Sequence, residues 1–165
     1  LATFVVIFLG SNIIKILGWR VGALATPAVM SIVAIPFFAC TVFLGVENPA
    51  VLHSATMIGT AMILLSRSTK YGLFDPTTQM AYIPLDEESK VKGKAAIDVL
   101  GSRVGKSGAS LFQQGLVVIF GNIIDASPAV MVVFYAVSIG WMMAANKLSV
   151  LYLSMAKEEK EKKKQ

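Results

Sequence analysis

The chain has 165 residues, of which 55% are hydrophobic and 15% charged, and its formal net charge is +5 at pH 7. Soluble domains carry about 25% charged residues, so this composition excludes an ordinary soluble globular domain. The mean hydropathy of +0.68 likewise indicates that lipid is the solvent for much of the chain.

Apolar stretches recur along the whole chain, and each is long enough to suggest a membrane span, because a hydrocarbon core about 30 Å thick takes roughly 20 helical residues. We expect spans at residues 1–17, 22–46, 50–73, 90–124 and 127–155, with a charged tail at 157–165. The sequence therefore predicts an all-α, polytopic membrane helix bundle, in which residues 1–156 form one transmembrane domain. Because an apolar run is already under way at Leu1, we expect the chain to be the C-terminal part of a longer protein.

Turn-forming residues separate these stretches. Gly18-Trp19-Arg20 predicts a short turn with Trp19 at a membrane interface, and Pro49 is well placed near a helix start. Asp75-Pro76-Thr77 predicts the end of one helix, with Asp75 capping the next turn. Pro84 followed by LDEES predicts another helix entry, with carboxylates near its positive end.

Polar residues then recur at intervals of four along the predicted fourth span: Lys90, Lys94, Asp98, Ser102 and Lys106. On an α-helix this spacing forms a polar stripe that drifts slowly around the axis. Lys106 begins the apolar stretch, where a charge costs about 2.5 to 3.5 kcal/mol at mid-bilayer depth and normally faces a cavity or a partner. The alternatives are that Lys106 snorkels to the interface and that Lys94 and Asp98 form a simple ion pair.

The stretch GSRVGKSGAS, residues 101–110, contains at residues 105–107 the Gly-Lys-Ser with which a phosphate-binding loop ends. Such a loop needs four residues between its glycines, but Gly101 and Gly105 are separated by three, and Leu100 stands where glycine is required. A soluble P-loop ATPase is therefore excluded. Gly101, Gly105 and Ala109 instead predict a small-residue face that lets two helices approach closely.

Three aromatic residues, Tyr71, Phe74 and Tyr82, cluster around the polar segment. They predict either stacking on a nucleic base or an aromatic belt at the membrane interface. Cys40 stands in an apolar run, which indicates packing, and no His, Cys and carboxylate residues stand together at ligand spacing. We therefore expect neither a metal site nor a cofactor.

The run KYGLFDPTTQMAYIPLDEESKVKGKAAIDVLGSRVGKSGASLFQQG, residues 70–115, closely resembles the ATP/ADP antiporters of plastids and of obligate intracellular bacteria. The flanking spans resemble theirs in number, length and placing. The resemblance implies an arrangement similar to the major facilitator fold, with this chain as most of its C-terminal half. It also implies exchange of ATP for ADP, with phosphate moved by some members, and an essential cavity lysine, placed on Lys106 with Lys94 as the alternative.

The residues and the resemblance together predict one mechanism. Lys106, helped by Lys94 and Arg103, is expected to hold the nucleotide phosphates, and Asp98 to fix a lysine or to exchange its ion pair as substrate arrives. No covalent step is implied, so we expect a carrier and not an enzyme, with nucleotides and the lipid bilayer as partners and no nucleic acid. The alternatives are a carrier of other nucleotides, since Gln79 stands where relatives often have an acid, and a structural membrane subunit. We expect a plastid inner envelope, with a bacterial inner membrane as the alternative.

The distribution of charge predicts the orientation in the membrane. Basic residues lie at Arg20, along residues 67–106 and in the tail, whereas the intervening turns hold Glu47 and Asp125. Cysteines introduced at Glu47 and Asp125 should therefore be labelled from the side of the membrane opposite to a cysteine at Lys157. Labelling of all three positions from one side by an impermeant maleimide contradicts the five-span topology.

Overall fold

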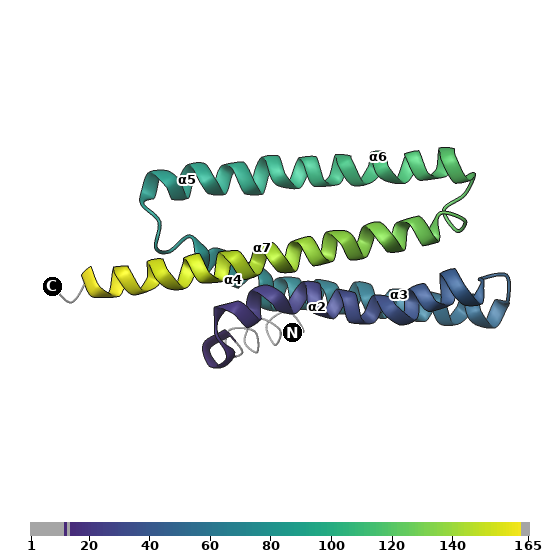
Figure 1. Ribbon diagram of the computed structural model, residues 1–165, viewed down its shortest axis with the longest axis horizontal. Helices are drawn as coiled ribbons and strands as arrows, with labels where there is room; N and C mark the ends of the chain where they lie inside the picture. The colour runs from purple at the N-terminus through teal and green to yellow at the C-terminus, as the bar shows by residue number, and fades with distance from the viewer. Residues whose placement is uncertain (1–11, 13, 163–165) are drawn as a thin grey trace. The chain divides into compact units, whose positions relative to one another are not determined.

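The computed structural model describes residue 12 and residues 14–162, and every regular element in that part of the chain is a helix (Figure 1). Some are π-helical turns, labelled η, in which an N–H bonds to the carbonyl five residues earlier. The elements in chain order are α2 (Trp19–Phe38), η1 (Ala39–Leu44), α3 (Pro49–Thr69), η2 (Lys70–Phe74), α4 (Asp75–Ala81), α5 (Glu87–Ala95), η3 (Ala96–Gly101), α6 (Ser102–Phe120) and α7 (Ser127–Lys162).

Within the described residues, three helices are long and apolar enough to cross a membrane: Trp19–Leu44, Pro49–Ala81 and Ser127–Met155. The prediction of an all-α membrane helix bundle is thereby confirmed. The predicted span at 1–17 falls mostly outside the described residues, and the predicted span at 90–124 is helical but is not one of these three. The division into five spans stays a prediction.

The chain divides into two compact units. One unit comprises the residues up to Pro84 together with those from Met131 onward, and it contains α2, α3, α4 and most of α7. The other is Leu85–Val130, which contains α5, η3 and α6.

The helix starts of the first unit follow from local sequence. Gly18 has a φ of 85°, a conformation that strongly favours glycine, and α2 begins at the next residue. The side chain of Asn48 accepts a hydrogen bond of 2.9 Å from the backbone N–H of Ala50, and Pro49 occupies the first turn of α3. The predicted helix start at Pro49 is confirmed, whereas the predicted turn at residues 18–20 is confined to Gly18, since Trp19 and Arg20 belong to α2.

The predicted break at Asp75-Pro76-Thr77 is wrong. The helix that begins at Pro49 continues through η2 and α4 to Ala81, and the N–H of Asp75 bonds to the carbonyl of Lys70, five residues earlier. A proline inside an α-helix clashes with the carbonyl four residues before it, whereas a π-turn widens the helix at that point. The helix thus absorbs Pro76 without ending, and Asp75 does not act as a cap.

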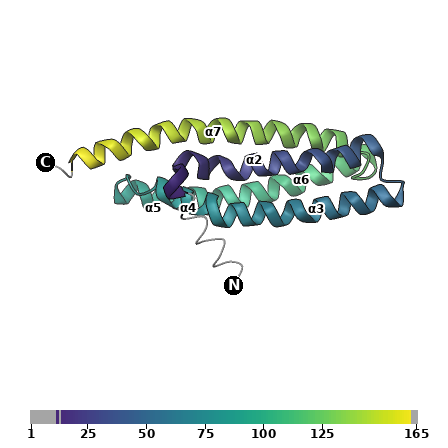
Figure 2. The ribbon, with the colours of Figure 1, turned by 90° about the horizontal axis from the view of Figure 1, so that it is seen from below.

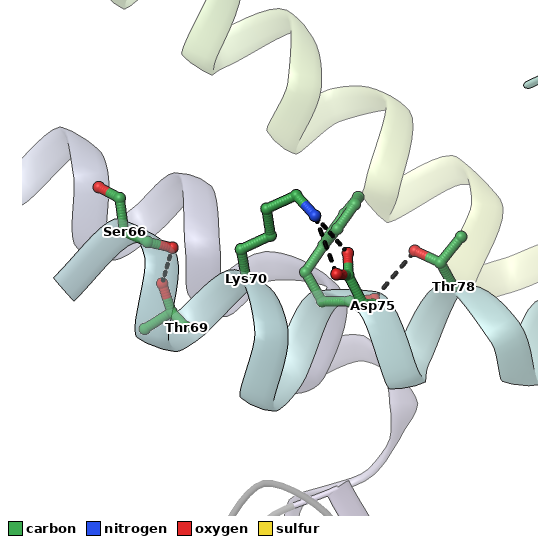
Figure 3. A network of polar contacts seen from close by, with 6 residues as sticks. Ser66, Thr69, Lys70, Asp75 and Thr78 are labelled. Carbon is green, nitrogen blue, oxygen red and sulfur yellow. Dashed lines mark hydrogen bonds and ion pairs between the residues drawn. The ribbon is translucent and has the colours of Figure 1, made fainter. Parts of the chain in front are cut away.

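The carboxylate of Asp75 instead binds the side chain of Lys70. The Lys70 ammonium donates to both carboxylate oxygens, at 3.0 and 2.8 Å (Figure 3). Residues five apart on an α-helix point about 140° away from each other, so this pair forms because the π-turn brings positions i and i+5 to one side. Both side chains are partly exposed, so the ion pair contributes little to the stability of the fold. Its main significance is that it indicates the position of the π-turn.

The first unit has its core where α2, α4 and α7 meet. Trp19, expected at a membrane interface, is only 6% exposed; its ring stacks on Tyr152 at 4.9 Å, and its indole N–H donates to the carbonyl of Thr77 at 2.9 Å. The residues that surround Trp19 in this core are Ala23 and Ala145, with Leu24, Met80, Ala81, Trp141 and Tyr152 packed against them.

Further contacts join α2 to α7 at other points along their length (Figure 2). The Phe38 ring lies 6.0 Å from the ring of Tyr135, whose hydroxyl donates to the carbonyl of Ser31 at 3.2 Å. Nearer the start of α2, the Arg20 Nε donates to Asn146 Oδ1 at 2.8 Å. These contacts fix α7 along α2 within the first unit.

The closest helix approach of the first unit lies at Gly22, which the sequence did not single out. A Cβ added to Gly22 would overlap the hydroxyl of Thr77, and it would lie 3.1 Å from Cγ1 of Ile14. Thr77 is 1% exposed and its hydroxyl donates to the Leu73 carbonyl at 2.6 Å, so it has little room to move. Gly22 is therefore required for α4 to lie against α2.

We predict that Gly22→Ala destabilises the purified protein by about 1–3 kcal/mol, because the added methyl group overpacks a closed contact. Thr77→Ala removes the clashing hydroxyl, so the double variant should lose less stability than the sum of the two single variants. Thermal unfolding in detergent measures both effects. Gly93→Ala is the control, since nothing lies within 4 Å of a Cβ at that position. Additive losses in the double variant would show that Gly22 and Thr77 do not touch.

Candidate functional site

The second unit is built on one continuous helix, in which α5, η3 and α6 follow each other without a break (Figure 1). It begins after Asp86, whose side chain accepts a hydrogen bond of 2.9 Å from the backbone N–H of Ser89. The helix entry predicted at LDEES is confirmed. Hydrogen bonds from the backbone and then the hydroxyl of Ser89 hold the pKa of Asp86 below its usual value, because they stabilise the carboxylate.

The first lysines of this helix are neutralised locally. Lys90 lies 3.5 Å from a carboxylate oxygen of Glu87, and Lys92 lies 2.5 Å from one of Glu88. These pairs lie on exposed faces of the first turns, where water also solvates the charges. The start of the helix therefore presents little uncompensated positive charge.

The cations further along the helix are placed differently. Arg103 and Lys106 are exposed on α6, and neither makes a hydrogen bond or ion pair with any described residue. Lys94 is also exposed, near the end of α5. The side chain of Asp98 lies outside the described part of the chain, so its predicted pairing with Lys94 stays a prediction. The unneutralised charge of the described helix is thus concentrated at Arg103 and Lys106.

The π-turn η3 determines on which side of the helix Lys106 lies. Lys94 and Lys106 are twelve residues apart, a separation that would place them ~120° apart around a regular α-helix. A single π-turn contains one residue more than an α-turn, which reduces the angle to ~20°. The drift expected for the polar stripe is therefore largely cancelled, and Lys94 and Lys106 lie on one face.

The same spacing limits what these side chains can bind together. Twelve residues correspond to ~18 Å along the helix axis, whereas Arg103 and Lys106 are separated by ~4.5 Å, less than one turn. Arg103 and Lys106 can therefore contact one phosphate chain together. Lys94 forms a second cationic position on the same face and is not part of one compact clamp.

The small-residue face of α6 is open in the described chain. No atom lies within 4 Å of a Cβ built on Gly101 or Gly105, and Ala109 is exposed. The close helix packing predicted for these three residues stays a prediction.

The three candidate stacking aromatics belong to the first unit, and only one of them is largely exposed. Tyr71 is 54% exposed, and the Lys70 ammonium lies 4.7 Å from its ring centroid. The Phe74 ring meets Trp141 edge to face at 5.1 Å, and Tyr82 is 7% exposed. The base-stacking role of these aromatics stays a prediction.

Sequence reasoning missed a set of polar residues on α6 beyond Lys106. An open hollow of about 490 Å³ on this helix is lined by the polar residues Ser110, Gln113 and Gln114, together with Val117 and Val118. The amides of the two glutamines make no hydrogen bond with any described residue. The signal was present in the sequence, since these polar residues follow Lys106 at helical spacing within an apolar stretch.

Among the described residues, a bundle with three helices long and apolar enough to cross a membrane defines an integral membrane protein. The model of the TLC ATP/ADP transporter family matches residues 1–152, and the chain belongs to this family.

Relatives of known name come from bacteria and plants. The chain is 45% identical to ADP,ATP carrier protein 1 of Chlamydia muridarum, over 96% of this chain and 32% of that protein. It is 39% identical to ADP,ATP carrier protein 2, chloroplastic, of Arabidopsis thaliana, over 96% of this chain and 27% of that protein. It is also 39% identical to ADP,ATP carrier protein 1 of Rickettsia bellii, over 87% of this chain and 31% of that protein. The chain therefore spans about a third or less of the length of these relatives. No solved structure matches it.

We predict that a pair of histidines placed across η3 binds a divalent metal more tightly when the two are five residues apart than when they are four apart. Histidines at i and i+4 share one face of an α-helix, whereas a π-turn brings i and i+5 together, as Lys70 and Asp75 show across η2. Ile97→His with Ser102→His should bind Ni²⁺ about tenfold more tightly than Ile97→His with Gly101→His, measured by titration calorimetry. The parent chain, which contains His53 alone, is the control. Tighter binding by the four-residue pair would mean that the helix is regular.

Proposed function

We propose that the full-length protein exchanges ATP for ADP across a membrane by alternating access. Family membership supports the proposal, as do the names of its relatives, which are ADP,ATP carrier proteins in Chlamydia, Rickettsia and plant chloroplasts. The chain corresponds to less than a third of the length of those proteins, so the remaining part of the substrate site is assigned to residues outside it.

One observation carries the assignment of the phosphate site: Arg103 and Lys106 are unneutralised cations less than a turn apart at the start of an apolar helical stretch. Charge at membrane depth is costly and normally faces a cavity or a partner. A nucleotide polyphosphate supplies several negative charges, and its oxygens accept strong hydrogen bonds from both guanidinium and ammonium groups. The substrate itself is the partner that these two residues lack.

The proposed transport cycle uses the rest of the helix as well. Lys94, on the same face as Lys106, offers a second position for phosphate on the way to or from the main site. Asp98 holds a lysine while the site is empty and releases it when phosphate arrives. The face formed by Gly101, Gly105 and Ala109 lets the helix rock against a neighbour, as carriers of this kind move around a fixed site. Because no bond is made or broken, the protein acts as a carrier and not as an enzyme.

The membrane in which the protein works is proposed from the relatives. Resemblance of the motif alone favours a plastid inner envelope, but the identity is higher to the Chlamydia carrier, at 45%, than to the plant carrier, at 39%. This difference favours the inner membrane of a bacterium. Inorganic phosphate is proposed as an additional substrate, to be tested in the same uptake assay.

We predict that Lys106→Gln in the full-length protein inserts normally, because it removes a charge from the apolar region, yet loses most exchange of ATP and ADP. Lys106→Arg should recover only part, since a planar guanidinium replaces a compact ammonium. Uptake of labelled ATP into expressing cells preloaded with ADP measures the exchange.

Lys92→Gln is the matched control, because Lys92 lies on the same helix and is paired with Glu88. It should leave exchange near the wild-type rate. Near-normal exchange by inserted Lys106→Gln would assign Lys106 to the membrane interface and remove it from the substrate site. If the wild-type protein takes up another nucleotide and does not take up ATP, the alternative of a carrier with different specificity is supported.

A further inference from the structure

The polar face of α6 continues past the cationic residues. Gln113 is seven residues beyond Lys106, which places it ~20° from Lys106 around the helix and ~10 Å further along the axis. Gln114 lies ~80° away from Lys106 by the same geometry. Of the two glutamines, Gln113 therefore shares the face of Lys106.

The surroundings of Gln113 combine polar and apolar groups, since Ser110 and Gln114 line the same hollow. Val117 and Val118 line the same hollow, and Leu111 and Phe112 follow the cationic part of the helix. The amide of Gln113 is without a hydrogen-bonding partner among the described residues. Gln113 is exposed, so its amide is accessible to a ligand that offers both a donor and an acceptor.

Adenine offers such a pair of groups. Its N6 amino group donates and its N7 accepts, and the carboxamide of glutamine matches both in a bidentate contact. Guanine presents two acceptors, O6 and N7, at the same edge, and pyrimidines lack N7. The side chain best suited to favour adenine over guanine on this face is therefore Gln113, while the valines provide apolar contact for the faces of the purine ring.

The order of groups along α6 matches the order of groups along a nucleotide. Charged residues come first, at Arg103 and Lys106, then the hydroxyl of Ser110, then the amide of Gln113. An extended nucleoside di- or triphosphate has its phosphates, its sugar and its base in this order. The ~10 Å between Lys106 and Gln113 is a separation that such a molecule spans.

We propose that Gln113 selects the base of the transported nucleotide, by a bidentate contact of its amide with the N6 and N7 edge of adenine. The proposal rests on the function proposed above, since it requires the phosphates to lie at Arg103 and Lys106. It orients the nucleotide along α6, with its base on the C-terminal side of its phosphates.

The test uses competition, because the ratio of two affinities does not respond to a general loss of folded protein. Uptake of labelled ATP by the full-length protein is inhibited with unlabelled ATP or GTP, and the ratio of the two inhibition constants is recorded. Gln113→Met keeps the length of the side chain and removes both hydrogen-bonding groups. It should lower the preference for ATP over GTP by about fivefold to a hundredfold. Gln114→Met is the matched control and should leave the ratio unchanged.

The outcomes separate this proposal from the proposed function. An unchanged ratio in inserted Gln113→Met, or an equal change in Gln114→Met, overturns the role of Gln113 even if Lys106→Gln abolishes exchange. Full exchange by Lys106→Gln overturns the phosphate site. If Gln113→Met does not insert, Gln113→Arg provides the second measurement, because arginine pairs with O6 and N7 of guanine and must shift the ratio towards GTP. No shift with Gln113→Arg also overturns the proposal.

Discussion

Inside a bilayer no water is available to an unpaired backbone group, so a helix that crosses it has to accommodate a proline or an extra residue within its own hydrogen bonds. In this protein the π-turns accommodate such residues. In η2 the turn precedes Pro76, and it sets the rotation that brings Thr77 against Gly22. In η3 the turn brings Lys106 to the same side as Lys94. The rotation of α4 and of α6, and with it the contact at Gly22 and the side on which Lys106 lies, depends on these added residues.

The charges of the second unit change in kind along its continuous helix. At the helix start, carboxylates and lysines neutralise each other in pairs such as Glu88 and Lys92. Further along, Arg103 and Lys106 are without partners among the described residues, and the rest of α6 carries only neutral polar groups, of which Gln113 is one. Such an order suits a ligand that is strongly anionic at one end and neutral and aromatic at the other.

Features that depend on neighbouring residues could be predicted from the sequence, whereas features that depend on contacts between helices could not. Helix starts depend on neighbouring residues, so Pro49 and the run LDEES after Pro84 were sufficient to locate the starts of α3 and α5. The continuation through Asp75-Pro76 was not predictable, because a π-turn leaves no mark in hydropathy and the local rule for proline favours a break. Gly22 was missed because its partner lies on another helix, whereas Lys106 stood out as a charge at the edge of an apolar run.

The two tryptophans of the sequence, Trp19 and Trp141, both belong to the core where α2, α4 and α7 meet. One stacks on Tyr152 and the other meets Phe74 edge to face. The tryptophan fluorescence of this chain is therefore an optical reporter of that junction. Its emission changes when α2 and α7 shift against each other, and a nucleotide that alters it without touching either indole reveals a movement of the bundle.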